Sequence, residues 1–101
     1  MNRTIKQILL KEKENLEDEI LSCLSNLNIL QNFTSEELDM SNEKIETESK
    51  REAANIDSYA LTKQKIEHWL KLMNDEDDEV YKEQIFNDLP WVQKQYDRLE
   101  N

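Results

Sequence analysis

The densest group of potential metal ligands in this 101-residue sequence is the acidic run at residues 75–79. Alternating carboxylates are typical of calcium loops, in which every second residue supplies an oxygen ligand. A twelve-residue EF-hand loop starting at the first aspartate meets two further ligand positions, at Asp77 and Glu79. The same register puts Val80 where the loop requires glycine and Phe86 where it requires glutamate. The run therefore fails as a calcium site, and we expect it to be the acidic start of a helix.

Nucleophiles and soft metal ligands are scarce. The chain has one histidine, His68, and one cysteine, Cys23, which excludes an internal disulfide, a cysteine-based zinc site and a histidine pair. Cys23 falls on an apolar seam, where we expect a buried, inert thiol, and we expect His68 to be partly exposed on a helix. Paired carboxylates are abundant, but acid–base catalysis needs a concave, dry site that a narrow helical bundle does not offer. We predict a non-enzymatic protein without a cofactor or metal.

The composition favours an all-α fold. Glycine is absent and proline occurs once, at Pro90, whereas β-hairpins, phosphate loops and nucleophile elbows depend on glycine at fixed positions. With 37% hydrophobic residues, a chain of this length builds one small domain around a narrow core. We therefore expect residues 1–101 to form a single helical domain.

Residues 3–32 have the periodicity of a long helix. Apolar side chains recur every seven residues, with two more at the interleaved positions: Leu9, Leu16, Cys23, Leu30, Ile20 and Leu27. Further apolar residues widen this seam, which suits packing against more than one neighbour. Lys13 occupies a seam position, so it either extends its charge out of the seam or marks a place without a partner helix.

Residues 33–38, the corner, carry the signature of a helix start. Thr34 is placed as an N-cap and Glu37 three residues later completes a capping box. Phe33 before the cap and Leu38 after it can close as a hydrophobic staple. We predict that the chain turns here into a second long helix.

The second helix is predicted over about 36–74, with one alternative left open. Asp39, Ser41 and Asn42 can each cap a later start, so the helix either begins near 36 or is broken until about 42. Short helices are expected at about 76–87 and 90–99, divided by the proline. The predicted fold is an antiparallel, coiled-coil-like helical hairpin with one or two short C-terminal helices, a three- to four-helix bundle.

The net charge of −10 is concentrated after residue 34. An acidic chain disfavours direct binding to nucleic acid or to an anionic membrane and favours a partner with a basic surface. Two acidic blocks, at 36–48 and 75–88, carry most of the excess. The candidate protein-binding residues are Glu36, Glu37, Asp39, Glu43, Glu46, Asp75, Asp77, Asp78 and Trp91.

Trp91 is the apolar member of that set. The stripe of the last helix is predicted at Leu89, Val92, Tyr96 and Leu99, and on a helical projection Trp91 points about 100° away from Val92. It is either an anchor for a partner or a residue that folds over the corner of the bundle beside Pro90.

Rows of carboxylates on a rigid helix can imitate the spaced phosphates of a nucleic acid. In size, charge and helicity the chain resembles the small acidic helical inhibitors of bacterial defence nucleases, including anti-CRISPR proteins. The resemblance implies an inhibitor or accessory subunit that occupies a basic, nucleic-acid-binding surface of a larger protein.

Two alternatives stay open. The wide seam of residues 5–30 favours a self-associating structural protein, such as a homodimer. Tyr96 and Glu100 form a Tyr-x-x-x-Glu motif that resembles the export signal of helical-hairpin substrates and chaperones of type VII secretion, although the Trp-x-Gly of that family is missing. The N-terminus has no apolar run long enough for a signal peptide or a membrane span, so we expect a cytoplasmic protein.

Overall fold

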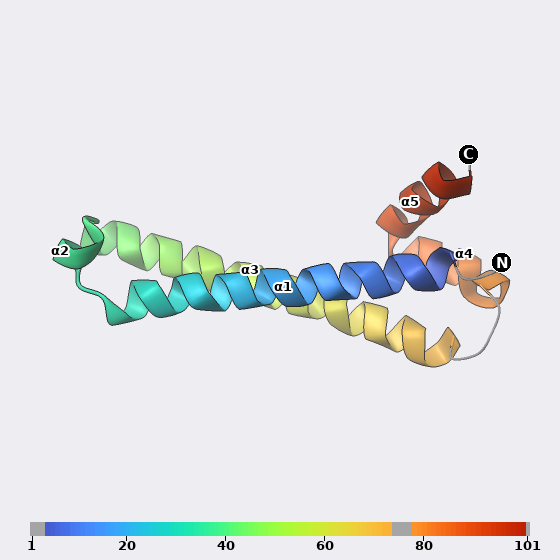
Figure 1. Cartoon of the computed structure of the whole chain (residues 1–101), viewed down its shortest axis with the longest axis horizontal. Helices are drawn as coiled ribbons and strands as arrows, with labels where there is room; N and C mark the ends of the chain where they lie inside the picture. Colours follow the sequence, from blue (N-terminus) through green and yellow to red (C-terminus); the bar gives the residue numbers. More distant parts are fainter. Residues whose placement is uncertain (1–3, 74–77, 101) are drawn as a thin grey trace. The chain divides into compact units, whose positions relative to one another are not determined.

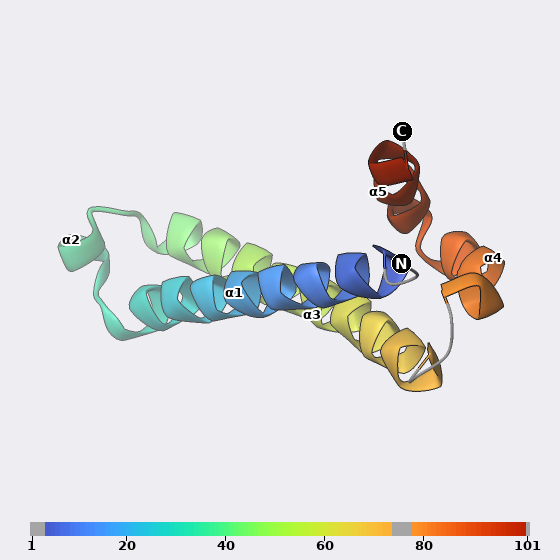
Figure 2. The ribbon, with the colours of Figure 1, turned by 45° about the vertical axis from the view of Figure 1, so that its right-hand side comes forward.

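The computed structural model describes residues 4–73 and 78–100. Over these residues the chain is all-α, with helices α1 (Thr4–Asn32), α2 (Ser35–Leu38), α3 (Asn42–Met73), α4 (Asp78–Asp88) and α5 (Pro90–Glu100). α1 packs against α3 as a hairpin, and α2 lies in the connection between them (Figures 1 and 2). The predicted all-α helical hairpin is confirmed. None of the described helices has a stretch long and apolar enough to cross a bilayer.

The second long helix starts later than residue 36. α2 ends at Leu38, and Asp39 adopts a left-handed conformation with φ 54°, which a right-handed helix cannot contain. Of the two alternatives left open, a helix that begins near 36 and one that is broken until about 42, the structure has the second. α3 begins instead after Ser41, whose hydroxyl accepts a hydrogen bond of 3.1 Å from the backbone N–H of Lys44.

The C-terminal segment contains the two short helices that the proline suggests. α4 ends at Asp88, and the N–H of Leu89 still donates to the carbonyl of Ile85 over 2.7 Å. Pro90 then opens α5, as its fixed φ and missing N–H favour at the first helical position. The acidic run lies only partly within the described residues, because α4 starts at Asp78.

The chain divides into two compact units. Unit 1 comprises residues 1–15 and 64–101, and unit 2 comprises residues 16–63, so each unit contains part of α1 and part of α3. The expectation of a single domain stays a prediction.

Unit 1 has a well-buried core. The described hydrophobic side chains that it buries come from all four of its helical segments: Ile5, Ile8, Leu9, Ile66, Met73, Ile85, Leu89 and Val92. Lys13 extends its charge out of the seam, since its Nζ lies 3.7 Å from Glu67 Oε2.

Aromatic side chains join α3 to α4 within unit 1. The indole N–H of Trp69 donates to Asp88 Oδ2 over 2.7 Å, and its ring packs against Tyr81 at 6.1 Å between centroids. The Nζ of Lys65 lies 3.7 Å from the other oxygen of Asp88. Trp69 is half-buried rather than fully in the core, because its polar edge is used at this junction.

α5 packs on α4 through Tyr96. Its ring lies 5.5 Å from Phe86, and the Nζ of Lys82 stands 4.6 Å from its centroid. Leu89 and Val92 are buried as predicted, but Leu99 is 65% exposed. The predicted apolar stripe of α5 is therefore wrong at its C-terminal end, where the side chain extends past the buried core.

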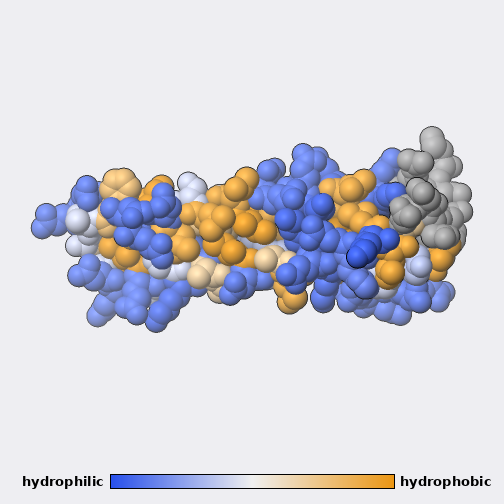
Figure 3. Space-filling view, turned by 90° about the horizontal axis from the view of Figure 1, so that it is seen from below, coloured by the Kyte–Doolittle hydropathy of each residue, from blue (hydrophilic) through white to orange (hydrophobic). Residues whose placement is uncertain are grey.

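Unit 2 buries much less. Its buried side chains within the described set are Leu16, Cys23 and Glu52, and the predicted seam residues Ile20, Leu27 and Leu30 are only half-buried. Large apolar side chains remain exposed: Leu21, Leu24, Ile29, Phe33 and Leu61. On the face drawn in Figure 3, orange hydrophobic side chains lie between blue hydrophilic ones. Unit 2 is a hairpin with one thin seam.

Candidate protein-binding site at the helical corner

Local hydrogen bonds build the corner. The Oγ1 of Thr34 accepts from the N–H of Glu37 over 3.1 Å, and Glu37 Oε1 accepts from the N–H of Thr34 over 2.9 Å. The predicted capping box is confirmed. Phe33 is 49% exposed, so a staple with Leu38 buries little of it.

Asp39 closes α2 in place of a glycine. Its N–H donates to the carbonyl of Glu36 over 3.2 Å, and the N–H of Met40 donates to that of Ser35 over 3.1 Å. This pair of bonds is the Schellman pattern, which normally uses glycine at the left-handed position. Aspartate and asparagine are the side chains that best tolerate this conformation. Asp39 therefore reverses the chain in a sequence that has no glycine.

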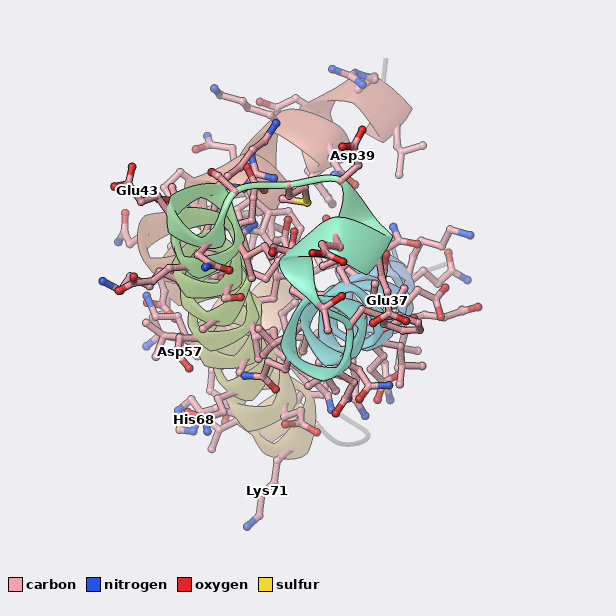
Figure 4. All side chains as sticks on the ribbon, turned by 90° about the vertical axis from the view of Figure 1, so that its left-hand side faces the viewer. Glu37, Asp39, Glu43, Asp57, His68 and Lys71 are labelled. Carbon is pink, nitrogen blue, oxygen red and sulfur yellow. The ribbon has the colours of Figure 1, made fainter. Side chains whose placement is uncertain are left out.

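The five acids predicted in this region are all exposed. They lie on α2, on the loop and at the start of α3: Glu36, Glu37, Asp39, Glu43 and Glu46. Figure 4 looks onto this end of the chain, with the labelled Glu37, Asp39 and Glu43 at separate places around the corner. We call these five residues the acidic corner. The three labelled residues lie apart around the turn instead of converging on one point, which suits an extended partner better than an ion.

The acidic corner is poorly neutralised from within. Glu46 pairs with Lys50 at 3.1 Å, and Glu37 is used by the capping box. Among the described residues, Glu36, Asp39 and Glu43 form no ion pair. Unit 2 as a whole holds eleven acidic and four basic residues, a net charge of −7, whereas unit 1 holds twelve and nine, a net charge of −3.

A groove lies next to the acidic corner. It has a volume of about 300 Å³ and is open to solvent. Its apolar wall comes from the end of α1, from α2 and from the loop: Ile29, Leu30, Leu38 and Met40. The groove is also lined by Asn26 of α1 and by Glu48, Arg51 and Glu52 of α3. We call this hollow the corner groove. It combines an apolar wall with carboxylates, all within unit 2.

Glu52 is the functional candidate that the sequence reasoning missed. It is only 8% exposed, and its Oε2 is buried without a hydrogen-bond partner. The sequence does contain a signal for the burial of Glu52. It belongs to a series that recurs every seven residues along α3: Ile45, Glu52, Tyr59, Ile66 and Met73. The charged member of that series occupies an inward position of the helix.

Cys23 of α1 is the neighbour of Glu52. It is buried, as predicted. Burial raises the pKa of the Cys23 thiol above its ordinary value of 9.0, and the hydrogen bond and negative charge of Glu52 and the charge of Glu19 raise it further. The thiol is protonated at neutral pH, and a neutral buried thiol is a poor nucleophile. The inert role expected for Cys23 agrees with this environment.

No protein-family model, curated protein or solved structure matches this chain. The interpretation of the site therefore depends on its geometry and charge.

The second acidic block is not brought to the corner. Asp75 and Asp77 lie outside the described residues, and Asp78 is the first residue of α4. Trp91 is a half-buried residue of α5 in unit 1, so its role as an anchor stays a prediction. His68 is exposed and packs edge-on against Trp69. Within residues 4–73 and 78–100, no three acidic, histidine or cysteine side chains are grouped so as to hold a metal ion.

Proposed function

We propose that this protein is a small acidic protein-binding module that occupies a basic surface of a larger protein, as an inhibitor or accessory subunit. The observation that carries the proposal is the acidic corner, in which Glu36, Asp39 and Glu43 are exposed and have no ion pair among the described residues. Exposed charges without internal partners are free to complement a partner, which speeds association and selects against acidic proteins.

The corner also holds its charges in place. The capping box and the Schellman turn fix the backbone that carries Glu36 and Asp39, so fewer conformations are lost on binding. The spaced carboxylates favour one kind of partner, a protein with a nucleic-acid-binding groove. Such a groove presents rows of lysine and arginine side chains.

The test replaces three corner acids that have no role in the turn: Glu36→Gln, Glu43→Gln and Glu46→Gln. The matched control replaces three exposed acids of unit 1, Glu67→Gln, Glu83→Gln and Asp97→Asn, which changes the net charge by the same amount. The immobilised proteins capture partners from a cell lysate at low and at high salt, and mass spectrometry identifies what is bound.

We expect capture of a protein with a basic surface that is lost at high salt and in the corner variant, but kept in the unit 1 control. If the captured protein binds nucleic acid, the chain should displace a labelled oligonucleotide from it. Equal loss in both triple variants would show that only net charge matters and would contradict a corner site.

A second candidate is a self-associating structural role, favoured by the exposed apolar side chains of unit 2. Leu21 and Leu24 stand one turn apart on the same face of α1 and are 65% and 47% exposed. A second copy of the chain is one way to cover them. Sedimentation over a range of concentrations tests this candidate, which requires a dimer that Leu21→Glu weakens; a chain that stays monomeric excludes it.

A further inference from the structure

The corner groove contains an incomplete ionic site. Glu52 lines the groove and is 8% exposed, and its Oε2 is buried with no hydrogen-bond partner. Buried carboxylates are normally paired with a cation or a strong donor. Glu52 departs from that rule where α3 lines a partly apolar hollow that is open to solvent.

The donors that the chain itself supplies near Glu52 are weak. The Nη2 of Arg51 is 4.0 Å from Glu52 Oε1, but this guanidinium is mostly exposed and forms its closer ion pair with Glu48. Cys23 offers only a thiol, which is a poor donor. The amide of Asn26 also lines the groove, but no group of the described residues donates to Glu52 Oε2, so this oxygen is left for a donor from outside.

The walls of the groove define which side chains can approach Glu52 from solvent. Leu30, Leu38 and Met40 form an apolar surface that suits a chain of methylene groups. The ligand therefore needs an aliphatic stem and a cationic head, and these are the two parts of a basic side chain.

Lysine fits better than arginine. An arginine fork uses both oxygens of a carboxylate, but Oε1 already lies beside Arg51, so a second guanidinium would face the first. An ammonium group is a compact charge that needs one acceptor at a time.

We propose that the corner groove receives one lysine side chain of the partner protein, with its stem on Leu30, Leu38 and Met40 and its ammonium group on Glu52. The inference rests on the proposed function, since it assigns a specific contact to the basic partner. Because Oε2 is closed to water in the free chain, the side chain of Glu52 must turn toward the groove as the lysine enters. The acidic corner then attracts the partner, and Glu52 selects where one of its lysines binds.

The probes are three helical peptides of alanine, glutamine and leucine that differ at a single central residue, which is lysine, arginine or norleucine. Norleucine keeps the four-carbon stem and removes the ammonium group. Titration of the full chain, followed by NMR of the Leu38 and Met40 methyl groups, gives a Kd for each peptide.

We expect the lysine peptide to bind roughly tenfold more tightly than the norleucine peptide, as for a hydrogen-bonded ion pair, and more tightly than the arginine peptide. Equal Kd values for lysine and norleucine, or no shift of either methyl group with any peptide, would overturn the inference. Tighter binding of arginine would overturn the choice of lysine.

The variants Glu52→Gln and Asp57→Asn each remove one negative charge from α3 within unit 2, and Asp57 is exposed and belongs neither to the groove nor to the acidic corner. Glu52→Gln should bring the lysine peptide to the affinity of the norleucine peptide, whereas Asp57→Asn should change it by about twofold or less. Equal effects of the two variants would overturn the inference. If Glu52→Gln does not fold, the comparison of lysine with norleucine on the unaltered chain still decides.

The outcome also separates the two proposals. If the corner triple variant loses its partner while Glu52→Gln keeps it, the acidic corner stands as the binding site and the lysine site in the groove is wrong.

Discussion

Unit 1 and unit 2 are built from the same two long helices but bury very different amounts of apolar surface. Of the buried hydrophobic residues in the described chain, eight belong to unit 1, and two, Leu16 and Cys23, belong to unit 2. The difference comes from the neighbours that each unit has. In unit 1, α4, α5 and the residue between them contribute Ile85, Val92 and Leu89 to the core. In unit 2 the additional helix is α2, which is four residues long and has no buried residue.

The comparison shows that a wide apolar seam needs more than one neighbouring helix to be covered. A helix stripe broader than a coiled-coil seam packs fully only when a further element covers its flank. Unit 2 lacks that element, so Leu21, Leu24 and Leu61 remain exposed beside a net charge of −7. Unit 1 therefore has the better-covered core, and unit 2 keeps more apolar and acidic surface exposed.

The largest expected effect separates two aliphatic residues of α3 that lie five positions apart. Ile66 in unit 1 is fully buried and Leu61 in unit 2 is 56% exposed. Ile66→Ala should lower the free energy of unfolding by about 2–5 kcal/mol, because it leaves a cavity, whereas Leu61→Ala should change it by about 0.5 kcal/mol or less. Urea titrations followed by circular dichroism measure both. Similar losses would show that the two units are packed equally well.

A smaller effect is expected at the junction of α3 and α4. Trp69→Phe keeps an aromatic ring but removes the N–H that donates to Asp88, and should cost about 1–2 kcal/mol. Asp88→Ala in the Trp69→Phe background should then cost less than it does in the unaltered chain. Urea unfolding of the four proteins gives the coupling energy of the pair. A coupling energy of zero would mean that the hydrogen bond does not hold α4 to α3.

Features set by neighbouring residues could be predicted from the sequence. Thr34 and Glu37 are three residues apart, so their capping box needs no tertiary contact, and Pro90 opens a helix by its own ring geometry. The sequence could only narrow the start of α3 to three candidate positions, Asp39, Ser41 and Asn42, because each of these residues can end or start a helix. Local hydrogen bonds in the folded corner decide among them.

Features that depend on distant neighbours could not be predicted in the same way. On α3 the apolar residue Ala53 is exposed, whereas its charged neighbour Glu52 is buried. Glu52 lies at an inward position of the seven-residue repeat of α3, but a search for hydrophobic residues does not find it. Its burial follows from the packing of α1, which carries Cys23, against α3. The exposure of Leu21 likewise depends on how many helices surround α1. The sequence of α1 alone does not give that number.

Loss of the capping box should have a local effect in unit 2. Thr34→Ala removes the oxygen that accepts from the N–H of Glu37 and should cost about 1 kcal/mol. This turn carries Glu36 and Asp39. The variant should therefore also weaken capture of a basic partner, by more than its small loss of stability explains. Serine at position 34 restores the acceptor and is the matched control. If alanine and serine behave alike, the cap contributes nothing to the corner.

The smallest effect tests whether the seam of unit 2 is closed around Cys23. Burial and Glu52 raise the pKa of this thiol above 9.0 in the folded chain, so folding favours its protonated form. That contribution to stability is complete below pH 9 and is lost as the pH rises through the raised pKa of the folded state. The difference in unfolding free energy between the unaltered chain and Cys23→Ala should therefore shrink between pH 8 and pH 10.5. The comparison isolates the contribution of Cys23, since the two proteins differ at this residue alone. A difference that stays constant would place the thiol in water in the folded chain, and the Cys23–Glu52 pair would then not close the seam beside the corner groove.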